Sequence, residues 1–320
     1  MNRSSFNSGL TVRGAFFWLV LFLCFAQSLW AANFIHDNGR VYVDNTYTFD
    51  DISIMRWPYK EPTERNLLSW LRFVVAADYN GGKGASEAYD FTLQANNSFT
   101  DKDGVQTSVQ YYGDNNDLNG ATVLIEDTIR TYAVNKGPKT NSVELQYKVT
   151  NTGTQTITAL YLGNNFFFDL PNPSTVVMNI DSARSMYYAQ TADSSIFVGA
   201  RVLSGKMHSA HTQYNSDAYS IVADGVIETI PANVPVNGFS ITLSQKFSSI
   251  TPNTSSTYVF GIFFGASLQD IQSASDNAYQ QYGGLGGSGG AIVKDVIYSG
   301  SPQLDTQPTS SGGGCLIKKN

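Results

Sequence analysis

The chain has 320 residues and a formal net charge of −6 at pH 7, from 26 acidic and 20 basic side chains. This acidic balance argues against a nucleic-acid partner, because binding to phosphates needs a basic surface that displaces counterions. Aromatic residues make up 13% of the chain and charged residues only 14%, which favours short strands joined by turns in one all-β domain followed by a tail.

The N-terminus has the pattern of a signal peptide. Arg3 and Arg13 give it a positive start, an apolar run follows from Ala15 to Ala26, and Ser28 to Ala32 offers small residues for cleavage. We therefore predict a signal peptide over residues 1–32 and a mature protein that is secreted or held at the cell surface. The alternative is a membrane anchor, but the run is shorter than the about 20 residues that span a bilayer.

The two cysteines have different expected fates. A lipoprotein would use Cys24, but Leu23 before it is bulky where a small residue is required. If residues 1–32 are removed, only Cys315 remains, and no intrachain disulfide can form. The folded domain must then be stabilised by its core, and the mature protein is not expected to be an integral membrane protein.

Short strands joined by polar turns recur along the chain, which is the pattern of a large antiparallel β-sandwich. Asn38-Gly39 predicts a hairpin turn before the strand Arg40 to Val43, and Thr46 to Phe49 follows a second polar turn. Further strands are predicted at Tyr89 to Leu93, Gln106 to Tyr112, Ala121 to Ile125, Ser195 to Val202, Tyr219 to Val222, Phe239 to Phe247 and Ser256 to Phe264.

The segment from Asn115 to Glu126 fits the template of a calcium-binding loop. Its oxygen-bearing residues occupy the template's ligand positions, with Gly120 at the sixth position and Glu126 at the twelfth. The flanks, however, read as strands, and Asn119-Gly120 is also an ordinary hairpin turn, which is the interpretation we favour. Ca²⁺ is the only cofactor that the sequence suggests, and its candidate ligands are Asp114, Asn115, Asp117, Asn119 and Glu126.

The segment from Val143 to Leu170 is the most informative part of the chain. Apolar and polar residues alternate from Val143 to Thr150, which predicts a strand with one buried face, and a second strand follows a polar turn. The segment resembles the galactose mutarotase-like supersandwich superfamily, in which such a strand ends in Asn-His-Ser/Thr-Tyr-Phe-Asn-Leu and the His is a general acid/base. Asn164, Phe168 and Leu170 match this motif, but Asn165 stands in place of the His. An amide does not titrate in the useful range, so the resemblance implies the fold and argues against the chemistry.

A second resemblance lies nearer the N-terminus. The stretches Asp51 to Tyr59 and Asn66 to Val75 are similar to two strands in the N-terminal supersandwich domain of family 15 glycoside hydrolases, the glucoamylase and glucodextranase relatives. Together the resemblances cover most of residues 33 to 283. The helical barrel that carries the catalytic carboxylates of those hydrolases has no counterpart in this chain.

Two histidines three residues apart, His208 and His211, could suggest a metal site. A spacing of three places the rings on opposite faces of a strand, and no third ligand is evident. We therefore interpret both as solvent-exposed side chains.

The end of the domain is predicted to be a helix. Ser267 can cap it, Asp270 is placed to complete a capping box, and Gly283 is a suitable stop. Leu268, Ile271, Ala274, Ala278 and Tyr282 fall on one face, so the helix should pack on a sheet.

A tail is predicted over residues 284–320. Its Gly- and Ser-rich sequence is typical of flexible coil, with Ala291 to Val293 as a candidate extra edge strand. The Gly-rich run before Cys315 resembles the C-terminal sorting signals of some bacterial surface proteins, which makes Cys315 a candidate attachment point. The alternative is an unattached thiol on the tail.

Aromatic side chains are the usual platforms for sugar rings, and they are also ordinary residues of a β core. The candidate platforms are Trp57, Tyr59, Trp70, Tyr111 and Tyr112. We interpret Trp70 as core because it lies in an apolar stretch. The predicted ligand-binding residues are Trp57 and Tyr59, which flank Pro58, together with Asn165 and Asp169.

The sequence thus predicts a secreted β-supersandwich, 33–283, that binds carbohydrate or a cell-surface component and has no identifiable catalytic residue. One alternative is a carbohydrate-active enzyme of the epimerase, lyase or hydrolase type, whose groove should then hold two facing carboxylates or a His/Glu pair. The other is a structural surface or matrix protein that acts through its tail and Cys315.

Overall fold

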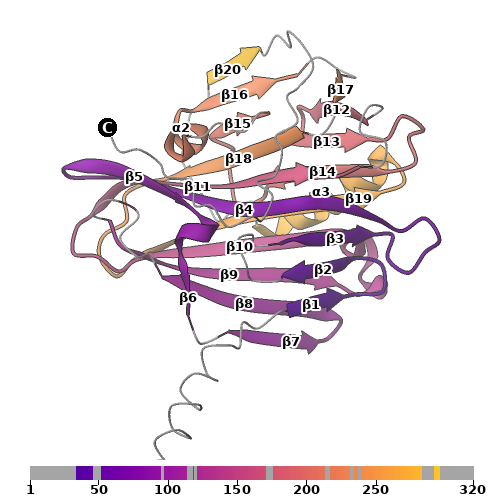
Figure 1. Ribbon diagram of the computed structural model, residues 1–320, viewed down its shortest axis with the longest axis horizontal. Helices are drawn as coiled ribbons and strands as arrows, with labels where there is room; N and C mark the ends of the chain where they lie inside the picture. Colours follow the sequence, from indigo (N-terminus) through magenta and orange to yellow (C-terminus); the bar gives the residue numbers. More distant parts are fainter. Residues whose placement is uncertain are drawn as a thin grey trace, which may run out of the picture. The chain divides into compact units, whose positions relative to one another are not determined.

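The computed structural model describes residues 34–45, 52–94, 97–113, 118, 121–170, 176–212, 217–230, 234–236, 239–282 and 292–295. Within them, two sheets of ten strands each pack face to face, and a helix lies on the outer face of each sheet (Figure 1). The chain is therefore the predicted all-β protein, a large, mostly antiparallel β-sandwich. No helix of the described residues is both long and apolar enough to cross a membrane.

The first sheet, sheet A, follows the order β1-β2-β3-β4-β11-β18-β15-β16-β20, with β5 paired to β4. Its neighbours are antiparallel except for the pairs β15–β16 and β16–β20, which are parallel. Its strands are β1 (Phe34–Asp37), β2 (Tyr42–Asn45), β3 (Ile54–Trp57), β4 (Arg65–Tyr79), β5 (Gly82–Glu87), β11 (Ile157–Phe168), β15 (Ser209–His211), β16 (Val226–Thr229), β18 (Phe239–Phe247) and β20 (Ile292–Asp295).

The second sheet, sheet B, follows the order β17-β12-β13-β14-β19-β10-β9-β8-β6, with β7 paired to β8, and is antiparallel throughout its described pairs. Its strands are β6 (Thr92–Leu93), β7 (Ser98–Lys102), β8 (Val105–Gly113), β9 (Val123–Tyr132), β10 (Ser142–Asn151), β12 (Val176–Asp181), β13 (Met186–Gln190), β14 (Phe197–Val202), β17 (Val234–Val236) and β19 (Ser255–Gly265).

The main core lies between the two sheets. Alternation directs every second side chain of β4, β10, β11 and β19 into it. Rings from opposite sheets meet there: Phe73 lies 5.5 Å from Tyr147, and Phe166 lies 5.4 Å from Phe260, between ring centroids. The predicted alternating strand from Val143 to Thr150 is β10, and its apolar residues are buried as expected.

Helix α3 (Leu268–Tyr282) confirms the predicted C-terminal helix. The hydroxyl of Ser267 accepts a hydrogen bond from the Asp270 amide at 3.2 Å, which is the cap read from the sequence. The buried face of α3 packs against the outer face of sheet B, and its residues are Ile271, Ala274, Ser275, Ala278 and Tyr282.

Helix α2 (Ala218–Ala223) corrects a prediction, because Tyr219 to Val222 was expected to be a strand. Asp217 caps the helix by accepting a hydrogen bond from the Tyr219 amide, and Ile221 and Val222 bury against the outer face of sheet A. Figure 1 shows α2 beside β15 and β18. A run of four residues is too short for its period to separate a helix from a strand.

Two short 3₁₀ segments complete the described structure: η1 (Ala88–Asp90) and η2 (Val134–Asn141). The first shows that the strand predicted over Tyr89 to Leu93 is wrong in its first half, because only β6 is extended. The strand predicted over Ala121 to Ile125 is the start of β9, which continues to Tyr132. The remaining predicted strands are confirmed to within a few residues, and β20 includes part of the candidate edge strand at Ala291 to Val293. Thr46 to Phe49 lies outside the described residues.

Candidate functional site

A line of polar side chains crosses the outer face of sheet A, on the side away from the core. Asn165 on β11 is directly opposite Arg72 on β4 and Thr242 on β18, and Thr242 is opposite His211 on β15. Side chains on neighbouring strands at the same level share one face of a sheet. We call this line the polar row, and with its flanking acids it consists of Glu87, Arg72, Asn165, Thr242, His211 and Glu228.

The centre of the polar row is buried without hydrogen bonds. Asn165 and Thr242 are each 1% exposed. Neither polar atom of the Asn165 amide, nor the Thr242 hydroxyl, has a hydrogen-bond partner among the described residues. Because buried polar atoms in folded proteins are nearly always paired with protein, water or a ligand, these three atoms need such a partner, which makes the row a candidate site.

Aromatic rings and a cation lie on the Asn165 side of the row. The Arg72 guanidinium carbon lies 4.8 Å from the centre of the Trp70 ring, and Trp70 stacks on Phe167 with centroids 6.2 Å apart. Arg72 also pairs with Glu87 at 3.8 Å. Trp70 is buried, as predicted, but it lies on the outer face instead of the core, because Leu71 next to it points between the sheets.

His211 lies between two carboxylates at the other end of the row. Its Nε2 is 3.1 Å from Asp224 Oδ1, and its Nδ1 is 3.4 Å from Glu228 Oε1. Burial lowers the pKa of the imidazole, but the hydrogen bonds and charges of the two acids outweigh it, so the His211 pKa is raised. Glu228 also accepts hydrogen bonds from the amide and hydroxyl of Thr212, at 2.7 and 2.9 Å.

The interpretation of His208 and His211 as solvent-exposed is wrong. His208 is only 5% exposed, and its Nε2 lies 3.3 Å from the Ala223 carbonyl oxygen. The side chain of His211 is 14% exposed. Both are enclosed because α2 covers this part of sheet A, and α2 was not recognised in the sequence.

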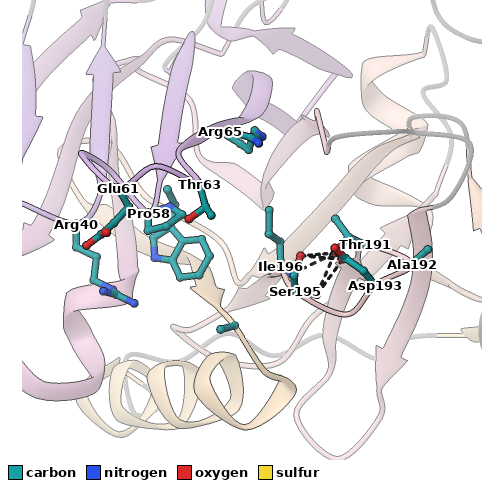
Figure 2. A pocket seen from close by; sticks show the side chains of 12 residues that line it. Arg40, Pro58, Glu61, Thr63, Arg65, Thr191, Ala192, Asp193, Ser195 and Ile196 are labelled. Atoms are coloured by element: carbon teal, nitrogen blue, oxygen red, sulfur yellow. Dashed lines mark hydrogen bonds between the residues drawn. The ribbon is translucent and has the colours of Figure 1, made fainter.

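A second hollow lies where the end of β3, the loop that follows it and the start of β4 face the loop between β13 and β14 (Figure 2). It has a volume of about 770 Å³. Trp57 is among its lining residues, but the indole is only 2% exposed, stacks on Phe264, and donates its N–H to Asn141 Oδ1 at 3.2 Å. The indole ring is therefore covered by other residues of the protein. Trp57 forms part of the wall of the hollow and does not present an open face to a sugar.

The four predicted ligand-binding residues do not form one site. Tyr59 packs on Tyr42, with centroids 4.9 Å apart, and does not line the hollow beside Trp57. Asn165 lies in the polar row, on another part of sheet A. Asp169 is exposed just after β11, where its amide donates to the Leu67 carbonyl.

Most of the candidate calcium ligands lie outside the residues that the structure describes. Asp114, Asn115, Asp117 and Asn119 lie outside the described residues. Glu126 is on β9, where its carboxylate lies 3.8 Å from the Lys148 ammonium across the strand pair. The described residues contain no group of three or more His, Cys, Asp or Glu that could hold a metal ion. Cys315 also lies outside the described residues.

Comparisons with known proteins give similarities of architecture only. No family model matches the chain, and no curated protein matches its sequence. Solved structures similar to it include a galactose mutarotase related enzyme from Lactobacillus acidophilus, with 9% identity, coverage of 74% of this chain and 98% of that one, and a TM-score of 0.46. A GalM/aldose epimerase homologue from C. elegans has 8% identity, coverage of 71% and 95%, and a TM-score of 0.42. A polysaccharide lyase has 13% identity, coverage of 78% and 35%, and a TM-score of 0.43. Likenesses this distant carry no argument about activity.

Sequence reasoning found Asn165 but missed its neighbours in the row. Arg72 was visible as a charged residue between the apolar residues Leu71 and Phe73, which places it on the face opposite theirs. Thr242 gave no such signal, because a threonine on a strand is ordinary, and only the pairing of β11 with β18 places it beside Asn165.

Proposed function

We propose that this chain is an exported, non-catalytic carbohydrate-binding module whose ligand lies along the polar row. The observation that carries the proposal is the pair of buried side chains, Asn165 and Thr242, whose polar atoms have no partner among the described residues. The export is proposed from residues 1–32, which have the pattern of a signal peptide.

A sugar has the chemistry that this arrangement requires. An amide and a hydroxyl can both donate and accept hydrogen bonds, as can the hydroxyl groups of a pyranose. Trp70 and Phe167 supply apolar surface next to them, and sugar rings present an apolar C–H face. Arg72 adds donors for ring or hydroxyl oxygens. The ligand class that satisfies the row is therefore hydroxyl-rich and mostly uncharged.

The centre of the row favours binding over turnover. Asn165 cannot take up or release a proton in the useful range. The Glu228 carboxylate accepts hydrogen bonds from His211 and Thr212. Burial raises its pKa, but these hydrogen bonds lower it by more, so the net pKa is lowered and the carboxylate stays ionised.

The test is a panel of immobilised glycans, including α-glucans, with binding and release of reducing sugar followed in the same wells. We expect binding without release. Thr242→Val keeps the shape and removes the hydroxyl, so it should weaken binding by about tenfold, the effect of one lost hydrogen bond of about 1.4 kcal/mol. The control is Thr100→Val, the same change at an exposed position on β7. Equal binding by wild type and Thr242→Val would refute this site.

A second candidate function, a carbohydrate-active enzyme, is favoured by one observation. His211 and Glu228 form the His/Glu pair that such an enzyme would need, with 3.4 Å between Nδ1 and Oε1. If this pair is catalytic, reducing sugar will be released, and Glu228→Gln will abolish the release while keeping most of the binding. If no sugar is released from any glycan that binds, the pair serves to hold β15 and β16 together.

A further inference from the structure

The hollow beside Trp57 is separate from the polar row and has two unlike walls. Figure 2 shows Arg40 and Arg65 on one wall, and the loop from Thr191 to Ile196 on the other. Its volume of about 770 Å³ lies within the range of about 300–1,000 Å³ that is usual for sites of small organic ligands. Pro58 and Ile196 add apolar surface.

The arginine wall holds the guanidinium groups of Arg40 and Arg65 and one carboxylate, that of Glu61, so its net charge is positive. The side chain of Arg40 donates from Nε to the neutral Asn141 side chain at 2.9 Å, and that of Arg65 donates to the Glu64 carbonyl at 2.6 Å. Neither guanidinium forms an ion pair within the part of the chain that the structure describes. A guanidinium has five N–H donors in a fixed plane, so donors remain on both arginines for a planar carboxylate.

The facing loop is held rigidly by its own hydrogen bonds. Asp193 Oδ1 accepts from the Thr191 hydroxyl at 2.6 Å, from the Ser195 hydroxyl at 2.7 Å and from the Ser195 amide at 3.1 Å. These donors lower the pKa of Asp193, which keeps its carboxylate ionised. No hydrogen bond from a described residue reaches the other oxygen, Oδ2, so it remains an acceptor for a hydroxyl group.

We propose that this hollow binds a sugar acid, a hydroxyl-rich molecule that carries one carboxylate. The carboxylate faces Arg40 and Arg65, and its hydroxyl groups face Asp193. The reverse orientation would place two carboxylates together and is disfavoured by charge repulsion. The proposal assigns a second ligand site to the chain, and it does not depend on binding at the polar row.

The experiment uses the purified protein with three probes: D-glucuronate, its neutral methyl ester, and acetate. Affinities are measured by titration calorimetry, and amide shifts of 191–196 in the ¹⁵N-labelled protein locate the bound probe. We expect glucuronate to bind about tenfold more tightly than the ester, as one charge-assisted contact would give. Acetate lacks the hydroxyl groups that reach Asp193, so it should bind more weakly than glucuronate as well.

Variants separate the two walls of the hollow. Arg65→Gln should weaken glucuronate by about tenfold and leave the ester unchanged, because only the acid uses the lost charge. Asp193→Asn should weaken the binding of both glucuronate and its methyl ester. Arg65 is exposed and holds only a neighbouring carbonyl, so its replacement should not unfold the protein. The control for charge is Lys102→Gln on the exposed strand β7.

Three results would overturn the proposal: equal affinities for glucuronate and its ester, equal affinities for glucuronate and acetate, or glucuronate binding that Arg65→Gln does not change. Thr242→Val provides the comparison with the polar row. If the two sites are separate, this variant binds glucuronate as tightly as the wild type does, whatever it does to neutral glycans. If it loses glucuronate binding, the sugar acid binds at the polar row and not in the hollow.

Discussion

Asp127 offers a test of the sandwich interior that depends on pH. It lies on β9, opposite Gln110 and Tyr147 in the two neighbouring strands, and is 1% exposed. Neither of its carboxyl oxygens has a hydrogen-bond partner among the described residues. Burial raises its pKa from 3.8 to about 8, against the opposing charge of Arg130. The folded protein thus holds a proton on Asp127 at neutral pH, whereas the unfolded chain does not.

This difference makes Asp127 reduce stability as the pH rises. Between pH 3.8 and about 8 the folded state binds one proton more than the unfolded state, so the free energy of unfolding falls by about 1.4 kcal/mol per pH unit. The sum is about 4 kcal/mol between pH 4 and pH 7.

His36 acts in the opposite direction. Burial lowers its pKa from 6.5 to about 4, although a hydrogen bond of the imidazole to the Gln106 backbone opposes the shift. Here the unfolded state binds the extra proton between pH 4 and 6.5, so stability rises with pH over that range. The two effects nearly cancel between pH 4 and 6.5. Above pH 6.5 the fall caused by Asp127 remains, and the raised pKa of His211 adds to it.

The substitution Asp127→Asn removes the first effect and keeps the second. We expect the free energy of unfolding of the variant, relative to that of the wild type, to rise by about 1.4 kcal/mol for each pH unit from about pH 4 to about pH 8. Urea unfolding at four pH values measures this difference, and all other titrating groups cancel in it. A difference that stays constant with pH would refute the reasoning, because it would mean that the Asp127 carboxyl ionises in the folded protein as it does in water.

Three further predictions concern single contacts and use urea unfolding. Thr242→Val should leave the free energy of unfolding unchanged or raise it by about 1 kcal/mol, because it removes an unpaired buried hydroxyl; a clear loss would mean that the hydroxyl is paired within the protein. Tyr282→Phe should cost about 1–3 kcal/mol, since its hydroxyl donates to Glu144 Oε2 at 2.7 Å and holds α3 to sheet B; no loss would contradict that anchor. Gly163→Ala should cost about 1–3 kcal/mol, because the new methyl group would lie 2.8 Å from a backbone oxygen and 2.9 Å from Val222 of α2; wild-type stability would show that α2 yields easily.

Patterns with a clear period were predictable from the sequence. The strict alternation from Val143 to Thr150 gave β10 and its buried face, and the Ser267 cap with apolar residues three and four apart gave α3. Each pattern lies within one short segment of the chain, and burial of its apolar residues is favourable whatever the rest of the fold. The capping hydrogen bond from Asp270 is likewise a contact between near neighbours.

Contacts between distant strands were not predictable in the same way. The stretch Leu67 to Val75 is apolar because both faces of β4 are covered, and Trp70 is therefore predicted to be core. Sheet B covers the inner face, and α2 and Phe167 lie on the outer face. Thr242 and Asn165 are 77 positions apart, and they meet only through the register of β11 with β18. A candidate site built across strands therefore depends on pairings that no single segment contains.

The spacing of the polar row also bears on the choice between binding and catalysis. Glu87 at one end of the row and His211 near the other are separated by β4, β11 and β18, or about 19 Å at the usual distance of about 4.8 Å between neighbouring strands. An acid and a base that act on one bond must both lie within hydrogen-bond reach of it. Glu87 and His211 cannot do so together, and Asn165 between them does not titrate. Any proton transfer in the row would have to come from His211 and Glu228 alone, whereas binding can use its whole length.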